Sequence, residues 1–281
     1  MMTTVPDTRP PDTLPRGLCT SAVCGVDLSA ASLDAACQAA RLVGMDGSLL
    51  LVAVPVGEPT AFVAPGGIGA TVVRTPVDDT IRGRYRTALL DAARDVQRAV
   101  PRTRTSVLDG DPVACLLDAI DAEGPSLVAV GSHDYHRLSG IVLSSVATHL
   151  LHRAPCSVLL ARRREPDHDG RILVGIDGSA ESLRALDVAT TLAARLNRRL
   201  VTLVAYGGKP VHDRNTVKLL HPKIETFDAP VHALASAADP SDIVVVGSRG
   251  LHGIRALGSV SERIAHRAPC SFLVVRDWNP T

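Results

Sequence analysis

Residues 243–259 read IVVVGSRGLHGIRALGS, and this stretch determines how the rest of the chain is interpreted. Its first four residues are apolar, which is typical of a strand buried on both faces of a parallel sheet. Gly247 ends the apolar run, and Gly250 and Gly258 follow it. Glycines let backbone N–H groups approach a ligand closely, because no Cβ intervenes. Ser259 then opens an expected helix, whose N-terminal N–H groups favour an anion, so the stretch is consistent with a phosphate-binding loop.

The same residues also have a purely structural interpretation. Ser259 and Glu262 have the spacing of a capping box, so Ser259 could serve only to start its helix. Glycines that follow a strand are often turn residues. The loop by itself therefore leaves both phosphate binding and simple chain reversal open.

Strands and helices are expected to alternate on both sides of this stretch. Strands are expected at the apolar runs 22–26, 48–56, 127–130 and 157–161 and at the more polar segment 103–108, and segments with helical periodicity or helix-capping residues separate them. This alternation predicts an α/β fold with a parallel sheet and right-handed crossovers.

Two sequence repeats divide the chain. HRAPCS occurs at 152–157 and again at 266–271, and VCGVDLS at 23–29 matches LVGIDGS at 173–179 in its apolar pattern, glycine, aspartate and serine. The copies lie much further apart than the roughly 20–50 residues of a solenoid repeat, so they indicate a duplicated domain. We expect a disordered tail at 1–20, a first domain at 21–162, a linker at 163–170 and a shortened second domain at 171–281.

Composition argues against several classes of protein. The net charge of +1 and the aromatic content of 2% disfavour a nucleic-acid surface or a base-stacking platform. No apolar run is long enough to span a bilayer, and no signal-peptide pattern occurs. The six cysteines form no CxxC pair, which is typical of free thiols in a reducing compartment. We therefore expect a cytoplasmic protein that binds neither nucleic acid nor membrane.

The candidate ligand site lies where strands end. Open parallel sheets bind ligands at the carboxyl ends of strands where the strand order reverses. Asp177 follows the first strand of the second half, and Gly247 and Ser248 end its fourth. A carboxylate there can accept hydrogen bonds from an adenine amine or from ribose hydroxyls, although Asp177 could instead be a turn residue. Arg249 could meet phosphate or simply be solvated, and Tyr206 after the second strand could contact the base.

These motifs resemble the universal stress protein family. The resemblance is carried by VGIDGS at 174–179, VVVGSRG at 244–250, GSVSERI at 258–264 and HRAPCSFLVV at 266–275. It implies two tandem Rossmann-like domains, similar to the adenine nucleotide alpha hydrolases, each an open, mostly parallel five-stranded sheet flanked by helices. It also implies that the last strand of each sheet pairs with a second domain, forming a homodimer or an intramolecular pseudo-dimer.

The resemblance further implies a ligand. Members of the ATP-binding branch carry an aspartate after the first strand and a G-x2-G-x9-G-Ser/Thr loop. ATP, alone or with Mg²⁺, is then expected at a site in the second half, and the implied function is a nucleotide-dependent regulatory or sensor module of the stress response. The alternative is a dimeric interaction scaffold of the same fold that binds no nucleotide. The site residues are Gly175, Asp177, Tyr206, Gly247, Ser248, Arg249, Gly250, Gly258, Ser259 and Val260.

The sequence departs from the family pattern in both halves. Seven residues, rather than nine, separate Gly250 from Gly258. In the first half, Gly131 is followed by Asp134 where the pattern has glycine, and by Ser144-Ser145 where it has a Gly-Ser pair. Loss of glycine prevents close backbone approach, and a carboxylate would repel a polyphosphate. We therefore expect the nucleotide in the second half and a degenerate site in the first.

No catalytic or metal-binding group is predicted. The sequence contains neither a GxxxxGK[ST] loop nor a GxSxG elbow, so slow ATP hydrolysis is the most that we expect. His149 and His152 lie three residues apart, which is more typical of a helix surface than of a metal site.

The last strand of each half is expected to need a partner. Residues 157–161 and 271–275 are apolar, and an unpaired apolar edge strand invites aggregation. We expect these strands to pair with each other or across a two-fold axis.

Overall fold

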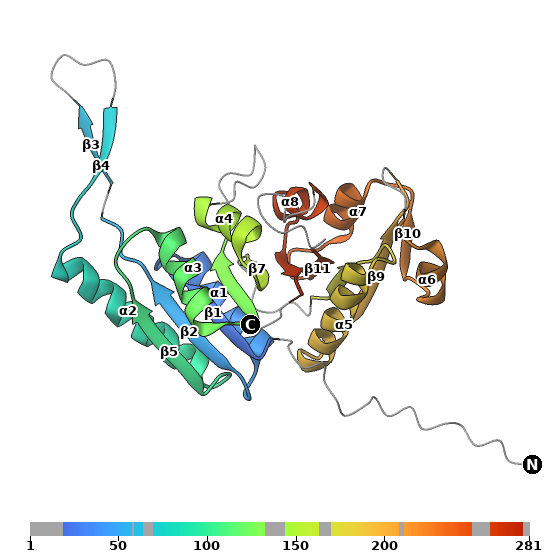
Figure 1. Cartoon of the computed structure of the whole chain (residues 1–281), viewed down its shortest axis with the longest axis horizontal. Coiled ribbons are helices and arrows are strands. Elements are labelled where there is room, and N and C mark those ends of the chain that lie inside the picture. The colour runs from blue at the N-terminus through green and yellow to red at the C-terminus, as the bar shows by residue number, and fades with distance from the viewer. Residues whose placement is uncertain are drawn as a thin grey trace, which may run out of the picture.

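The computed structural model describes residues 19–57, 59–63, 70–132, 144–162, 170–207, 211–248 and 259–277, which form one ten-stranded sheet, its flanking helices and a separate hairpin (Figure 1). The elements of the first half are β1 (Ser21–Gly25), α1 (Ala30–Val43), β2 (Ser48–Ala53), β3 (Pro59–Val63), β4 (Ala70–Arg74), α2 (Asp79–Gln97), β5 (Arg102–Val107), α3 (Pro112–Glu123), β6 (Leu127–Gly131), α4 (Ser145–Arg153) and β7 (Ser157–Ala161). Those of the second half are β8 (Ile172–Gly175), α5 (Ala180–Arg195), β9 (Leu200–Ala205), α6 (Arg214–Leu219), β10 (Ile224–Thr226), α7 (Pro230–Ala237), β11 (Ile243–Gly247), α8 (Ser259–Ala265) and β12 (Ser271–Val275).

The two halves of the sheet repeat one strand order. The first half runs β5-β2-β1-β6-β7 and the second runs β10-β9-β8-β11-β12, with parallel pairing inside each half. β12 pairs with β7 in the antiparallel sense, with Leu273 opposite Leu159. This is the intramolecular one of the two arrangements that the sequence allows, and it joins the two expected five-stranded sheets into one.

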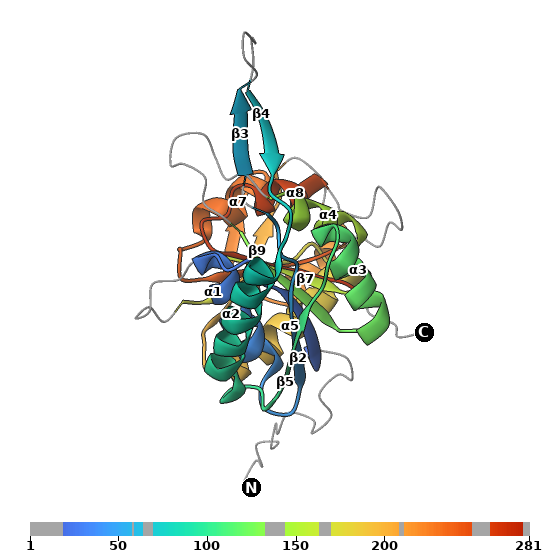
Figure 2. The same cartoon turned by 90° about the vertical axis from the view of Figure 1, so that its left-hand side faces the viewer.

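Alternation along the strands divides the core into two layers. In β1, Val23 packs on one face of the sheet and Cys24 on the other, and both are fully buried. The layer that contains Cys24 is covered by α1, α2 and α5, and the layer that contains Val23 by α3, α4, α7 and α8. Figure 2 shows α1 and α2 on one side of the sheet and α3 and α4 on the other. The fold is therefore the three-layer α/β arrangement that the sequence predicts.

Two arginines, Arg162 fully buried and Arg276 partly buried, connect the halves reciprocally. Arg162, which follows β7, donates from its guanidinium to the carbonyls of Ala265 and Ala268 at the end of α8. Arg276, which follows β12, donates in the same way to Leu151 and Ala154 at the end of α4. Helix C-termini carry unpaired carbonyls and the negative end of the helix dipole. Each guanidinium therefore donates to such carbonyls and places a positive charge at that end of the helix. We call these two contacts the arginine clamps.

The segment between β2 and α2 differs from the expectation. The sequence pattern predicts no strand between residues 56 and 103, whereas β3 and β4 form an antiparallel hairpin there, with Phe62 opposite Thr71. Both views show this hairpin extending away from the sheet (Figures 1 and 2). The residues at its tip lie outside the described part of the chain.

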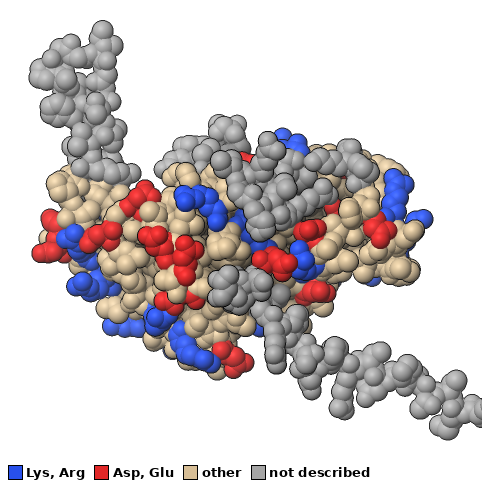
Figure 3. Space-filling model, in the orientation of Figure 1, with Lys and Arg blue, Asp and Glu red and all other residues tan. Residues whose placement is uncertain are grey.

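The surface and the helices carry two further observations. Figure 3 shows basic and acidic side chains interspersed over the visible face, in keeping with the net charge of +1. Within the described ranges, no helix combines the length and apolar content needed to cross a membrane.

Candidate functional site

The candidate site of the second half lies at the carboxyl ends of β8 and β11, which are neighbours in the sheet. Between them the strand order reverses, because the chain continues from β8 to β9 on one side and from β11 to β12 on the other. Gly175 ends β8 and precedes Asp177 by two residues, and Gly247 ends β11. The structure thus brings these three predicted residues to the position where open α/β sheets bind ligands.

Asp177 organises the turn from β8 into α5. Its Oδ1 accepts hydrogen bonds from the N–H of Ser179 at 3.0 Å and from the hydroxyl of Ser179 at 2.5 Å. Ser179 in turn caps α5 by accepting from the N–H of Ser182 at 3.2 Å. Asp177 therefore makes the hydrogen bonds expected of a turn residue. A carboxylate has the capacity to accept further hydrogen bonds from a ligand as well.

A segment that precedes α6 crosses beside this turn. The N–H of Asp213 donates to the carbonyl of Asp177 at 3.1 Å. Gly178 has φ +80°, and a Cβ there would lie 2.5 Å from the carbonyl oxygen of Asp213. Hydrogen bonds from Thr216 and Asn215 lower the pKa of the Asp213 carboxyl. Asp213 therefore remains an anion close to the turn that Asp177 forms.

Gly247 has a packing role that sequence reasoning missed. A Cβ on this residue would lie 2.3 Å from the carbonyl oxygen of Glu181 in the first turn of α5. The glycine lets the helix lie directly against the end of β11, so this contact alone explains the residue. Ser248 is buried, and its N–H donates to the carbonyl of Val275 at 2.9 Å as a continuation of the sheet. That N–H is therefore already bonded within the protein.

Tyr206 lies past the end of β9 among polar and aromatic neighbours. Its hydroxyl donates to Oε2 of Glu225 at 2.9 Å, and this hydrogen bond raises the pKa of the phenol. The guanidinium carbon of Arg214 lies 5.8 Å from its ring centroid, and the ring of Phe227 lies 5.7 Å away. Phe227 itself is 88% exposed. A planar apolar ring could stack on this group.

The remaining predicted site residues are only partly located. Arg249, Gly250 and Gly258 lie outside the described residues. Ser259 and Val260 form the first two positions of α8, as the sequence predicts for the start of that helix. Among the described residues, no group of three or more His, Cys, Asp and Glu side chains could hold a metal ion.

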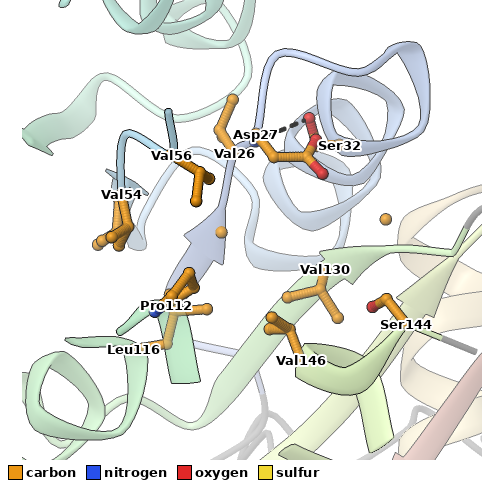
Figure 4. Close-up of a pocket in the computed structure, with 13 residues that line it drawn as sticks. Val26, Asp27, Ser32, Val54, Val56, Pro112, Leu116, Val130, Ser144 and Val146 are labelled. Carbon is orange, nitrogen blue, oxygen red and sulfur yellow. Dashed lines mark hydrogen bonds between the residues drawn. The ribbon is translucent and has the colours of Figure 1, made fainter. Parts of the chain in front are cut away.

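The first half contains a pocket at the equivalent position, which sequence reasoning did not identify. It measures about 160 Å³ and lies at the carboxyl ends of β1, β2 and β6 (Figure 4). Six valines, Leu116 and Pro112 form most of its wall, and Asp27, Ser32 and Ser144 supply polar atoms. The lining residues come from separate strands and from two helix starts. No contiguous motif marks them, so sequence patterns gave no signal.

Comparisons with known proteins place the chain among relatives of one family. A family model described as the universal stress protein family matches residues 20–162 and 223–276. A universal stress protein of Mycolicibacterium smegmatis is 27% identical over 288 residues, which covers 90% of this chain and 95% of that protein. A universal stress protein of Mycobacterium tuberculosis strain H37Rv is 26% identical over 221 residues, or 66% of this chain and 74% of that protein.

A solved structure extends the likeness to the whole fold. The crystal structure of a universal stress protein from Archaeoglobus fulgidus superposes with a TM-score of 0.65 at 20% identity. The match covers 92% of this chain and 98% of that one. Both halves of the sheet therefore have counterparts in a single known structure.

Proposed function

Because the chain belongs to the universal stress protein family, we propose that it binds ATP in its second half and that occupancy regulates its association with partner proteins during a cytoplasmic stress response. One observation carries the proposal. Asp177 and Gly247 lie at the ends of adjacent strands, and the helix that follows β11 begins at Ser259. A carboxylate, a glycine-rich connection and a helix start are the parts that a nucleotide site at a strand-order reversal needs.

The residues of the proposed site would contact different parts of ATP. Asp177 would accept hydrogen bonds from the base or ribose, and Tyr206 would contact the base. The N–H of Ser248 is engaged by β12, so the phosphate donors would come from Gly250 onward and from the start of α8. Arg249 would add positive charge, and the phosphates would hold any accompanying Mg²⁺.

Thermal unfolding of nucleotide-stripped protein tests this proposal. ATP at a hundred times its Kd should stabilise the fold by about 2.7 kcal/mol, because it binds only the native state. Asp177→Asn keeps the acceptor for Ser179 while removing the charge, and Gly250→Asp places a carboxylate in the glycine-rich connection. Both should reduce the ATP-dependent shift, whereas Asp27→Asn at the matching turn of the first half should not. The proposal fails if millimolar ATP leaves the wild-type unfolding temperature unchanged.

A second candidate function is an interaction scaffold that binds no nucleotide. It is favoured by the use of the Ser248 N–H within the sheet and by the segment at Asp213 that crosses beside Asp177. The edges of β7 and β12 are already paired with each other, so partners would have to use another surface. Mass spectrometry that finds ATP or ADP in the purified protein would contradict the scaffold.

A further inference from the structure

The two ends of the ten-stranded sheet carry different side chains. β5 is the terminal strand at one end and β10 at the other (Figure 1). β5 exposes Arg102 and Arg104, and charges of one sign on an edge strand oppose its pairing with an identical edge. The segment around β10 exposes Lys223 and Glu225, which have opposite signs and can pair across two copies. The β10 end is therefore the one suited to meeting a copy of itself.

The backbone at this end follows β9 over more than the length of β10 itself. The N–H of Lys223 donates to the carbonyl of Thr202 at 3.1 Å, and the carbonyl of Thr226 accepts from the N–H of Tyr206 at 2.8 Å. Backbone groups of alternate residues in a strand point to opposite sides. The outer edge of residues 223–226 therefore presents N–H and C=O groups with which another strand can pair.

Large hydrophobic side chains are exposed on both sides of this strand along the chain. Within the described ranges, the two most exposed large hydrophobic residues are Phe227, at 88%, and Leu219, at 78%. Phe227 follows β10 directly, and Leu219 ends α6, five positions before β10. The ring of Phe227 lies 5.7 Å from that of Tyr206 and leaves most of its surface in water. Covering both side chains with a second chain would be favourable.

The order of charges along the segment indicates what that second chain is. Residues 218–228 read KLLHPKIETFD, with basic residues in the first part and acidic residues in the second. The four charged residues are all exposed: Lys218, Lys223, Glu225 and Asp228. Edge strands of two copies related by a two-fold axis run antiparallel, so the basic part of each meets the acidic part of the other. The segment is thus complementary to itself.

One register satisfies the charges and the apolar residues together. With Ile224 on the two-fold axis, Lys223 of each copy lies opposite Glu225 of the other, and opposite charges in such cross-strand pairs are favourable. Glu225 accepts from Tyr206 through Oε2, and Oε1 can accept from a lysine. The same register places Phe227 opposite His221 of the second copy, which has φ +45° in the turn after α6. The exposed ring would then meet the turn that follows Leu219.

This pairing ends at two copies. A contact between β10 of one copy and β5 of the next would be heterologous and would continue into a filament. It would also bring Arg102 and Arg104 near Lys223 of the next copy, which costs Coulomb energy. The two-fold arrangement uses both β10 edges and closes.

We propose that two copies of the chain associate through antiparallel pairing of their β10 edges, with Ile224 on the axis, so that the sheet continues from one copy into the other. This surface lies at the opposite edge of the second-half sheet from β12, which is paired with β7. The association requires no nucleotide, so it stands or falls separately from the proposed ATP site.

Sedimentation equilibrium of the full-length, nucleotide-free protein tests the proposal over about 1 µM to 1 mM, the range in which weak complexes dissociate. We expect a concentration-dependent equilibrium between monomer and dimer. Lys223→Glu and Glu225→Lys each turn both axial pairs into like charges, so each variant should weaken the dimer at least about tenfold. An equal mixture of the two variants should recover the wild-type affinity, because every cross-strand pair in the mixed dimer again joins opposite charges.

Two further variants separate this surface from general effects of charge. Phe227→Ser should weaken the dimer at least about tenfold, because the covered ring is lost. Asp91→Lys is the control, since Asp91 is an exposed carboxylate on α2, far along the chain from the edge. It should leave the dimer unchanged, and circular dichroism verifies that every variant is folded. A wild type that stays monomeric at the highest concentration would overturn the proposal and leave the edge to a strand of another protein. A dimer that tolerates both charge reversals, or a mixture that fails to recover it, would also contradict the proposed pairing.

Discussion

At the scale of single residues, Asp27 and Asp177 show why a motif does not identify a ligand. Each carboxylate accepts from the N–H and the hydroxyl of the serine two positions later, with nearly equal distances. The turn is therefore the same in both halves. What differs is the surroundings: valines line the pocket beside Asp27, while the chain at Asp213 crosses beside Asp177. The sequence predicted the turns, but neighbours from distant elements decide what each site can bind.

Cys37 provides a prediction at this scale. It is the exposed cysteine of the chain, and the other five are buried. Burial raises the pKa of Cys19 to about 11 and that of Cys156 and Cys270 to about 12, so their thiols are neutral at physiological pH. Iodoacetamide should therefore alkylate Cys37 first in the folded protein, as peptide mass spectrometry would detect.

The pH dependence of that alkylation follows from its surroundings. Partial desolvation raises the pKa of Cys37 above its usual value. The reactive thiolate is the deprotonated form, so the alkylation rate should rise with pH. The midpoint of this rise should lie at a higher pH than for a free cysteine peptide. Urea-unfolded protein is the control, because all six thiols should then react alike. Alkylation of Cys156 or Cys270 at the rate of Cys37 in the native protein would contradict the burial.

At the scale of elements, glycines at the ends of strands let helices approach the sheet. Gly131 ends β6 and Gly247 ends β11, and a Cβ on either would lie within 2.5 Å of the first turn of α1 or α5. The sequence pattern alone suggests that Gly247 exposes backbone to a ligand. The packing contact explains the glycine without a ligand, so its presence is compatible with both proposed functions.

A pair of alanine substitutions tests this packing role. In Gly247→Ala the new methyl group would meet the Glu181 carbonyl, so we expect a loss of about 1–3 kcal/mol in unfolding free energy. Gly83→Ala is the matched control. It lies in α2 with no atom within 4 Å of the added Cβ, and it should stabilise by about 0.5–1 kcal/mol. Urea unfolding measures both, and a stabilised Gly247→Ala would rule out the close contact.

Many of the elements that the sequence predicted carry a clear local signal. Strands such as β6 and β11 are apolar throughout because both faces are buried, and helices such as α3 have a proline start and a glycine end. The hairpin of β3 and β4 was missed because its short runs, TAFV and TVV, flank Pro65-Gly66-Gly67 and resemble a loop. The position of β10, the third strand of the second half, was not predicted, because its three residues are too few to show a two-residue alternation. The first-half pocket was missed because its wall is assembled from three strands.

At the scale of the whole molecule, the repeated hexapeptide HRAPCS now has a physical explanation. Its alanines, Ala154 and Ala268, offer the carbonyls that the arginine clamps bind. Its serines, Ser157 and Ser271, accept from the N–H groups of Arg276 and Arg162 at 3.2 and 3.0 Å. Each copy of the motif thus receives the arginine of the other half. The repeated motif therefore marks the interface between the halves as well as the duplication of the domain.

The clamps and the β7–β12 ladder should hold the halves together without a covalent connection. A protease site placed between β7 and β8 should, after cleavage, leave two fragments that co-elute in gel filtration. Removing one guanidinium loses the hydrogen bonds that this charged group donates to two backbone carbonyls, a cost of about 3 kcal/mol. Arg162→Met or Arg276→Met should therefore weaken fragment association on the order of 100-fold.

Arg94→Met is the control for that experiment, since Arg94 is 72% exposed and pairs with Asp91 within α2. It should leave association unchanged, because exposed ion pairs contribute little. Circular dichroism of the uncleaved variants separates a loss of folding from a loss of association. If cleaved Arg162→Met and Arg276→Met associate as tightly as the cleaved wild type, the ladder and the other contacts between the halves, such as the hydrogen bond from Ser271 to Gln38, suffice to join them. The arginines would then serve only to end α4 and α8.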